Sequence, residues 1–241
     1  HKYIAEELFA SVTESGRERL AELSLLPSIS LTRAARLLGD ESDQVIGEGT
    51  RVGFLTDARS GVLAMHPLLR EFLYRKLLDL PASSRESIVR EVVRFLISER
   101  EWDEAFEVVR QFDMPDALDD LLEASLYELL DSGHLVTIVK IVAAGRSQGA
   151  DDSLLDLADA ELAFRDGFHE RAQRLAEGAS ERLREDSPFA SKALSLAGNS
   201  AYFGEAIPAA QRSFQEARKL AATREDERRA TWGLFLAALE Q

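Results

Sequence analysis

Apolar residues recur at helical spacing along most of the chain, but one short region follows a different pattern. Two brief apolar runs, Gly53–Thr56 and Val62–Met65, are separated by the turn-like segment Asp57–Gly61. Short runs joined by a Gly-containing loop are typical of a β-hairpin. Pro67 then suits the first position of a helix, where its missing N–H group is not needed. The apolar residues that follow predict this helix by their spacing: Leu68, Leu69, Phe72, Leu73 and Leu77.

Helical patterns precede the hairpin and, together with it, define a first domain at residues 1–80. Ile4, Leu8 and Val12 mark one helix, and further helices are expected at 17–25, 31–39 and 42–48. Helices followed by a hairpin predict a winged-helix domain, a fold that often places a helix in the major groove of DNA. The helix at 42–48 carries acidic side chains and no basic one, so it would repel phosphates. We therefore interpret the domain as a module that contacts protein.

The pattern of residues 81–150 predicts a second part, a helical arm. Pro81–Ser84 has the composition of a linker, and Ser84 suits a helix N-cap. Short helices separated by short turns stack against one another and build an α-solenoid. Trp102 is expected to pack on the preceding helix. The predicted arm helices after it are Asp103–Phe112, Pro115–Leu122, Leu126–Asp131 and Leu135–Ala144.

Residues 151–241 repeat a pattern similar to that of tetratricopeptide (TPR) repeats. Small residues let paired helices approach closely, and Gly198 and Phe214 fall at a small and an aromatic position of the pattern. Asp156 departs from it, because an aromatic residue is usual there. Three small residues recur with an offset of 37 or 38 residues: Gly167, Ala172 and Ala179 recur as Gly204, Ala210 and Ala217. The expected fold is mainly α, with a winged-helix domain and a small β-hairpin followed by an α-solenoid of TPR-like helical hairpins.

The chain has 241 residues, and the helical pattern of Thr231–Gln241 runs to the last of them without a stop signal. We therefore expect a longer parent protein. The net charge is −14, and acidic side chains outnumber basic ones in each of the three parts. Because binding to a phosphate backbone needs a basic excess, nucleic acid is an improbable partner.

Cysteine is absent, and no run approaches the roughly 20 apolar residues of a membrane span. We expect no membrane partner, and a cytoplasmic location. Catalytic and cofactor motifs are missing as well: the sequence contains no phosphate-binding GK[ST] loop and no nucleophile elbow. The four histidines, His1, His66, His134 and His169, lie too far apart in sequence for a metal-binding pattern. The sequence therefore predicts a protein that is not an enzyme and holds no cofactor within these residues.

The first two parts resemble a known family. The segments YIAEELFASV, ERLAELSLLPSISLTRAARLLG and VGFLTDARSGVLAMHPLLREFLYRKL are similar to the winged-helix domain of STAND signalling ATPases. The resemblance is strongest to the bacterial maltose-regulator (MalT-like, LuxR-type) transcriptional regulators. It continues through EWDEAFEVVRQFDMPDALDDLLEASLYELLDSGHLVTIVKIV, which resembles the helical arm after that domain. Together the similar segments span Tyr3–Val142.

The resemblance singles out His66 as a cofactor-binding residue. In related ATPases a Met-His-Asp motif closes the winged helix. Its histidine contacts the β-phosphate of ADP and keeps the protein in its inactive state. Met65 and His66 stand at that place, whereas Pro67 replaces the aspartate, so only the histidine role carries over. The position at a helix start, where free N–H groups accommodate an anion, agrees with this role. The alternative is that His66 caps the helix or fills the corner beside the hairpin.

Three functions are compatible with these patterns. The first is the regulatory middle of a STAND signalling ATPase that controls transcription. Its winged helix would contact the nucleotide-binding domain of the same chain, and its repeats would bind an inducer or a protein partner. ADP or ATP and a LuxR-type output domain are what the resemblance implies for the whole protein. The second is a stand-alone TPR-like interaction scaffold without nucleotide switching. The third and weakest is a DNA-binding winged helix fused to repeats.

Overall fold

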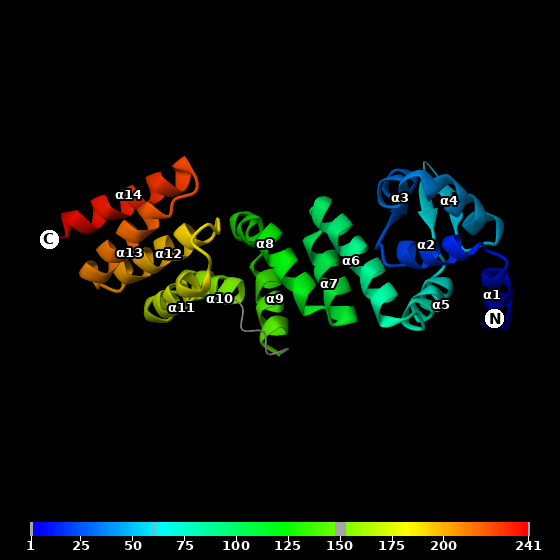
Figure 1. Ribbon diagram of the computed structural model, residues 1–241, viewed down its shortest axis with the longest axis horizontal. Coiled ribbons are helices and arrows are strands. Elements are labelled where there is room, and N and C mark those ends of the chain that lie inside the picture. The colour runs from blue at the N-terminus through cyan, green and yellow to red at the C-terminus, as the bar shows by residue number, and fades with distance from the viewer. Residues whose placement is uncertain (1, 60, 148–152, 241) are drawn as a thin grey trace. The chain divides into compact units, whose positions relative to one another are not determined.

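The computed structural model describes residues 2–59, 61–147 and 153–240, and more than two-thirds of them are helical (Figure 1). Contacts divide the chain into two compact units, His1–Ala117 and Leu118–Gln241. The division falls within the predicted arm, whereas the boundary expected at 150/151 lies outside the described residues. No helix among the described residues is long and apolar enough to cross a membrane.

Helices make up most of the N-terminal unit, with three short strands between them (Figure 1). Thr13 caps the second helix by accepting a hydrogen bond from the N–H of Gly16, and Ser30 caps the third through the N–H of Arg33. The elements in order are α1 (Lys2–Ala10), α2 (Glu14–Ser24), β1 (Ile29–Ser30), α3 (Leu31–Leu38), the 3-10 helix η1 (Gly39–Glu41), α4 (Ser42–Arg51), β2 (Thr56–Arg59), β3 (Val62–Ala64), α5 (Pro67–Leu78), α6 (Ala82–Ser98) and α7 (Trp102–Phe112).

The predicted hairpin is confirmed, but its first strand starts later than expected. The N–H groups of Phe54 and Leu55 donate to the carbonyl oxygen of Gly49, at 2.8 and 3.0 Å. Both side chains are fully buried, so this segment closes α4 and fills the core, and the strand begins only at Thr56. A third strand, β1, pairs with β3 and completes an antiparallel sheet of order β1-β3-β2. The sequence did not predict β1, because two residues are too few to show an alternating pattern.

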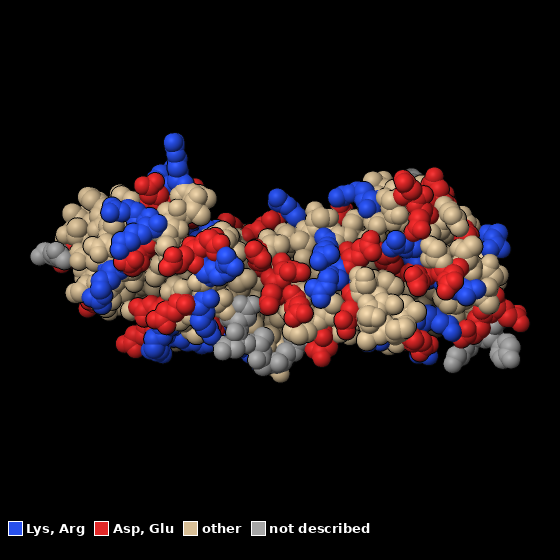
Figure 2. Space-filling view, viewed as in Figure 1, with Lys and Arg blue, Asp and Glu red and all other residues tan. Residues whose placement is uncertain are grey.

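The helix expected at 42–48 is longer than predicted, since α4 continues to Arg51. Arg51 therefore gives this helix one basic side chain, and its guanidinium donates to the carbonyl oxygen of Ser11 at 3.3 Å. The prediction that the helix carries no basic residue was wrong for this reason. On the face of the molecule shown in Figure 2, basic side chains are interspersed with acidic ones.

Aromatic packing and one arginine hold α5 in place. The rings of Phe9, Phe54 and Phe72 lie with centroids 5.4–6.2 Å apart and join α1, the segment after α4, and α5. The Arg70 guanidinium donates to the carbonyl oxygens of Ser24, the last residue of α2, and of Leu26, two residues beyond it. Because the last carbonyls of a helix have no partner within it, Arg70 satisfies groups that would otherwise be left unpaired. These contacts fix the start of α5, where His66 lies.

One continuous helix, α8 (Pro115–Ser132), replaces the two helices predicted at 115–122 and 126–131. Ser125 lies between them in sequence and is fully buried. Its hydroxyl donates to the carbonyl oxygen of Leu121 at 2.6 Å, so its polar group is satisfied inside the helix. A buried serine whose hydroxyl bonds to a carbonyl of its own helix does not interrupt that helix, which is why the predicted break was wrong.

The C-terminal unit consists of consecutive helices that pack as hairpins, as the TPR-like pattern predicts (Figure 1). Gly167, with φ +82°, forms the turn between α10 and α11, a conformation that favours glycine. After α8 the unit contains α9 (Leu135–Ser147), α10 (Ser153–Arg165), α11 (His169–Arg182), α12 (Ala190–Phe203), α13 (Ile207–Lys219) and α14 (Arg224–Leu239).

Small residues lie at the predicted close contacts between these helices. Ala172, Ala210 and Ala217 are all fully buried, which confirms their predicted burial. Gly198 faces the ring of Phe214, and a methyl group added to it would lie 2.7 Å from a ring carbon. Asp156, which replaces the usual aromatic residue, forms ion pairs with arginines of α9 and α11. An ion-pair contact therefore stands where aromatic packing is usual.

Replacing Ala210 with leucine is expected to lower the unfolding free energy by about 1–3 kcal/mol, because the added atoms overpack a filled contact. Ala238→Leu is the matched control, since Ala238 is exposed on α14 and the same change should cost little there. Urea unfolding of both variants measures the difference. Equal stability of the two variants would show that the register of this repeat is wrong.

Candidate functional site

His66 lies at the junction between the sheet and α5, where the sequence placed it, and it is exposed. It is the N-cap of α5: its Nδ1 accepts a hydrogen bond from the N–H of Leu68 at 3.2 Å. A nitrogen that accepts carries no proton, so the neutral ring has its proton on Nε2. The helix-capping alternative is therefore present in the structure, and it leaves Nε2–H as a donor available to a partner.

The N–H groups at the start of α5 are already occupied. The N–H of Leu68 bonds to the His66 ring, and the N–H groups of Leu69 and Arg70 donate to the carbonyl oxygen of His66, at 2.9 and 3.0 Å. Pro67 has no N–H group. The expectation that free N–H groups here accommodate a phosphate was therefore wrong. A nucleotide phosphate at this position would receive one hydrogen bond, from Nε2 of His66, and none from the N–H groups of Leu68, Leu69 and Arg70.

A groove of about 780 Å³ runs beside His66 between α1 and α5. Its walls are mainly apolar, and Leu68 is 65% exposed within it. Lys76 lies in the groove but is bound: its ammonium pairs with Glu6 at 2.8 Å and lies over the rings of Phe9 and Phe72. An apolar wall with paired charges suits contact with a protein surface better than with a free nucleotide.

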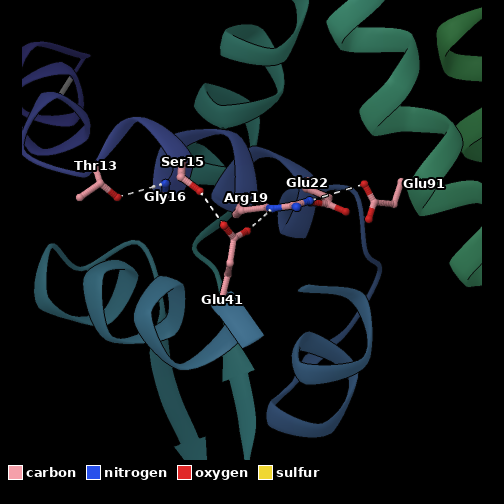
Figure 3. Close-up of polar contacts among 7 residues, drawn as sticks. All are labelled: Thr13, Ser15, Gly16, Arg19, Glu22, Glu41 and Glu91. Atoms are coloured by element: carbon pink, nitrogen blue, oxygen red, sulfur yellow. Dashed lines mark hydrogen bonds and ion pairs between the residues drawn. The ribbon is translucent and has the colours of Figure 1, made fainter. Parts of the chain in front are cut away.

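A second polar site in the N-terminal unit was not predicted from the sequence. Arg19 on α2 donates to Glu22 at 2.7 Å and to Glu41 of η1 at 2.8 Å, and it pairs with Glu91 of α6 at 3.5 Å (Figure 3). Ser15 also donates to Glu41, at 3.2 Å. One guanidinium thereby joins three helical elements. The sequence signal that could have found it is Glu22, an acidic residue among the apolar positions of α2.

Burial sets the chemistry of this cluster. Glu22 is fully buried, and its Oε1 has no hydrogen-bond partner among the described residues. Burial raises the pKa of Glu22 to about 7, and the hydrogen bond from Arg19 offsets only part of that effect. By contrast, hydrogen bonds from Arg19 and Ser15 lower the pKa of the exposed Glu41. Of the carboxyls bound to Arg19, Glu22 thus has a raised pKa and Glu41 a lowered one.

Two further arginines connect α3 to the hairpin of α6 and α7. Arg33 pairs with Glu101 at 2.8 Å, Arg36 pairs with Glu99, and both guanidiniums lie over the ring of Phe95. Together with the ion pair between Arg19 and Glu91, these contacts hold the hairpin of α6 and α7 to α2 and α3.

Comparisons with known proteins support the fold. No protein-family model and no curated protein matches the chain. Among solved structures, the chain is similar to the crystal structure of a STAND (Signal Transduction ATPase with Numerous Domains) protein with a tetratricopeptide repeat sensor from Pyrococcus horikoshii. The TM-score is 0.71 at 14% sequence identity.

The similarity covers 100% of this chain and 36% of the solved one. The chain thus corresponds to about a third of that protein. At this identity the similarity shows the fold. The predicted mainly helical chain with a small sheet and a TPR-like solenoid is confirmed, while the winged-helix assignment of residues 1–80 stays a prediction.

Proposed function

We propose that these residues are the regulatory and sensor region of a STAND-type signalling ATPase. The N-terminal unit contacts the nucleotide-binding domain of the same protein, and the C-terminal repeats bind an inducer or a protein partner. The observation that carries the proposal is the similarity to a STAND protein over the whole of this chain, through both the sheet-bearing unit and the repeats. Control of transcription by a further output domain is the form of signalling that the sequence resemblance favours.

The apolar groove between α1 and α5 supports the first part of the proposal. Exposed leucines at 68 and 78 form part of a surface that a nucleotide-binding domain would cover. His66 stands at the groove, and its Nε2 has no hydrogen-bond partner among the described residues, so it would reach the β-phosphate of ADP from the rim of such a contact. ADP bound there would favour the contact and keep the protein inactive.

We expect the parent gene to encode a GK[ST] phosphate-binding loop before residue 1. The gene sequence is the first test. The second test measures ADP binding by the full-length protein with His66 replaced by alanine. Loss of a hydrogen bond worth roughly 1–3 kcal/mol should weaken ADP binding about ten- to a hundredfold and shift the protein toward its active state without inducer. Titration with labelled ADP measures the affinity.

His66→Asn separates the two roles of the histidine. Asparagine is a good N-cap, so this variant should keep the stability of α5, whereas His66→Ala should lose about 0.5–2 kcal/mol. If His66 contacts ADP, both variants weaken ADP binding, because neither side chain places a donor where Nε2 lies. If ADP affinity is retained in both and only the alanine variant is less stable, His66 is a cap alone and its sensor role is wrong.

A further inference from the structure

The C-terminal unit contains a cavity of about 680 Å³, lined by α8, α10, α12, the loop before α12, and the start of α14. These are alternate helices of the hairpin series, so the cavity lies along one face of the stacked helices. Its volume is in the range of small-molecule sites. Leu130, Phe164 and Leu196 supply apolar wall, and the remaining lining is rich in polar groups.

Two hydroxyl groups in the cavity wall are left without a partner. Ser195 is 2% exposed, and its Oγ has no hydrogen-bond partner among the described residues. The buried hydroxyl of Tyr127 also has no hydrogen-bond partner among the described residues. The Tyr127 ring stacks on the Phe189 ring, with the two centroids 6.0 Å apart. Nearly all buried polar groups in proteins are hydrogen-bonded, and a bound molecule or an ordered water would satisfy these two hydroxyls.

Several charged residues of both signs that line the cavity form no ion pair within the described residues. Glu161 and Asp131 make no ion pair or hydrogen bond within the described parts of the chain, and Arg165 makes none either. Lys192 lies with its ammonium 4.1 Å above the Tyr127 ring instead of on a carboxylate. Burial raises the pKa of Glu161 even though Arg165, Arg229 and Lys192 favour its charged form. Within the described residues, no basic group forms an ion pair with this carboxyl.

The remaining acidic residues of the cavity already have partners within the protein. Asp226 accepts from the Thr223 hydroxyl at 2.7 Å, and Glu225 lies 3.8 Å from Arg228 and from Arg229. Both stand in the first turn of α14, where negative charge complements the helix dipole. The groups that lack both an ion pair and a hydrogen bond within the described residues are thus two carboxylates, two cations and two hydroxyls, a set that an anion or a cation alone would satisfy only in part.

We propose that this cavity binds a small zwitterion, a free α-amino acid or a short peptide with free ends, whose carboxylate lies against Lys192 and Arg165 and whose ammonium lies against Glu161 and Asp131. The hydroxyls of Tyr127 and Ser195 bond to its polar groups. The apolar wall contacts its side chain. This inference deepens the proposed sensor role, on which its regulatory meaning rests, while the binding itself requires only the repeats.

The purified chain of 241 residues is screened by thermal shift against each of the twenty free amino acids and against trialanine. At least one is expected to raise the melting temperature and to give a measurable Kd by calorimetry. Its N-acetyl derivative lacks the ammonium and its amide lacks the carboxylate, so each should bind at least about tenfold more weakly. A response to trialanine without one to free amino acids identifies the ligand as a peptide, and the converse identifies a free amino acid.

Variants locate the site. Glu161→Gln and Lys192→Met should each weaken binding of that ligand by about tenfold or more. The matched controls, Glu170→Gln and Lys219→Met, change exposed residues outside the cavity and should bind as the wild type does. Circular dichroism without ligand confirms that each variant is folded; Glu161→Gln should fold well, because it removes a carboxyl that burial disfavours.

The proposal is overturned if no member of the panel shifts the melting temperature, if the blocked derivatives bind as tightly as the zwitterion, or if the Glu161 and Lys192 variants bind like their controls. None of these results bears on ADP binding by the full-length protein. Conversely, unchanged ADP affinity in the His66 variants would overturn the nucleotide contact and leave this binding site intact.

Discussion

Replacing Glu22 with glutamine is expected to stabilise the N-terminal unit at alkaline pH by up to about 3 kcal/mol, and to change its stability little in acid. The cause is the burial of the carboxyl, which raises the pKa of Glu22 from its usual 4.5 to about 7. Below the unfolded-state pKa the group is protonated in both states, and the unit keeps its full stability. As the pH rises through the folded-state pKa, the buried group must ionise and that stability is lost. Glutamine is neutral throughout and keeps the stability of the protonated form.

The measurement is urea unfolding at about pH 4 and about pH 8.5, on either side of both pKa values. The chain has two tryptophans, Trp102 in the N-terminal unit and Trp232 in the C-terminal one. In a Trp232→Phe background the fluorescence of Trp102 therefore reports the N-terminal unit by itself. Trp232 is 61% exposed, so this background change should perturb the fold little.

Glu41→Gln is the control with the opposite sign. Glu41 bonds to the same arginine, but its pKa is lowered, so it contributes stability above its usual pKa that is lost as the pH falls. The glutamine variant should therefore be less stable than the wild type at about pH 8.5 and similar to it in strong acid. Loss of stability in Glu22→Gln at alkaline pH would contradict the argument, because the ion pair with Arg19 would then outweigh the cost of burial.

The helices were largely predictable because their signals are local. The recurring small residues of the repeat pattern predicted the close contacts at 172, 210 and 217. The errors came where burial and backbone bonding decide between similar patterns. The apolar run at Phe54 and Leu55 resembles a strand, but bonds to Gly49 hold it as a buried turn.

The candidate sites were harder to predict, since they depend on contacts between distant residues. His66 was found because a sequence resemblance and the following Pro67 both mark its position; its contact with a nucleotide stays a prediction. The Arg19 cluster joins residues that are 22 and 72 positions away in sequence, and ion pairs of this kind leave no periodic trace. The cavity near Glu161 likewise depends on how four separate helices are stacked.

Replacing Phe214 with alanine is expected to lower the unfolding free energy of the C-terminal unit by about 3–5 kcal/mol. The ring is 1% exposed and packs in a core with Ala201 and Ala210. It removes a large apolar surface from water, and the surrounding backbone cannot collapse fully into the space that it fills. Urea unfolding followed by Trp232 fluorescence in a Trp102→Phe background measures the change. Phe168→Ala is the control, because that ring is already 60% exposed and its loss should cost much less.

The double-mutant cycle with Gly233→Ala tests why Phe214 packs where it does. A methyl group added at Gly233 would lie 2.4 Å from the Phe214 ring, so the single variant should lose about 1–3 kcal/mol by overpacking. With Phe214 already replaced by alanine, the same methyl enters the vacated space, and the helix preference of alanine over glycine remains. The second change should then be neutral or stabilising, giving a coupling of about 1–3 kcal/mol between the two positions. Additive losses would show that the ring does not lie against Gly233, and that α12, α13 and α14 are not held together by this contact.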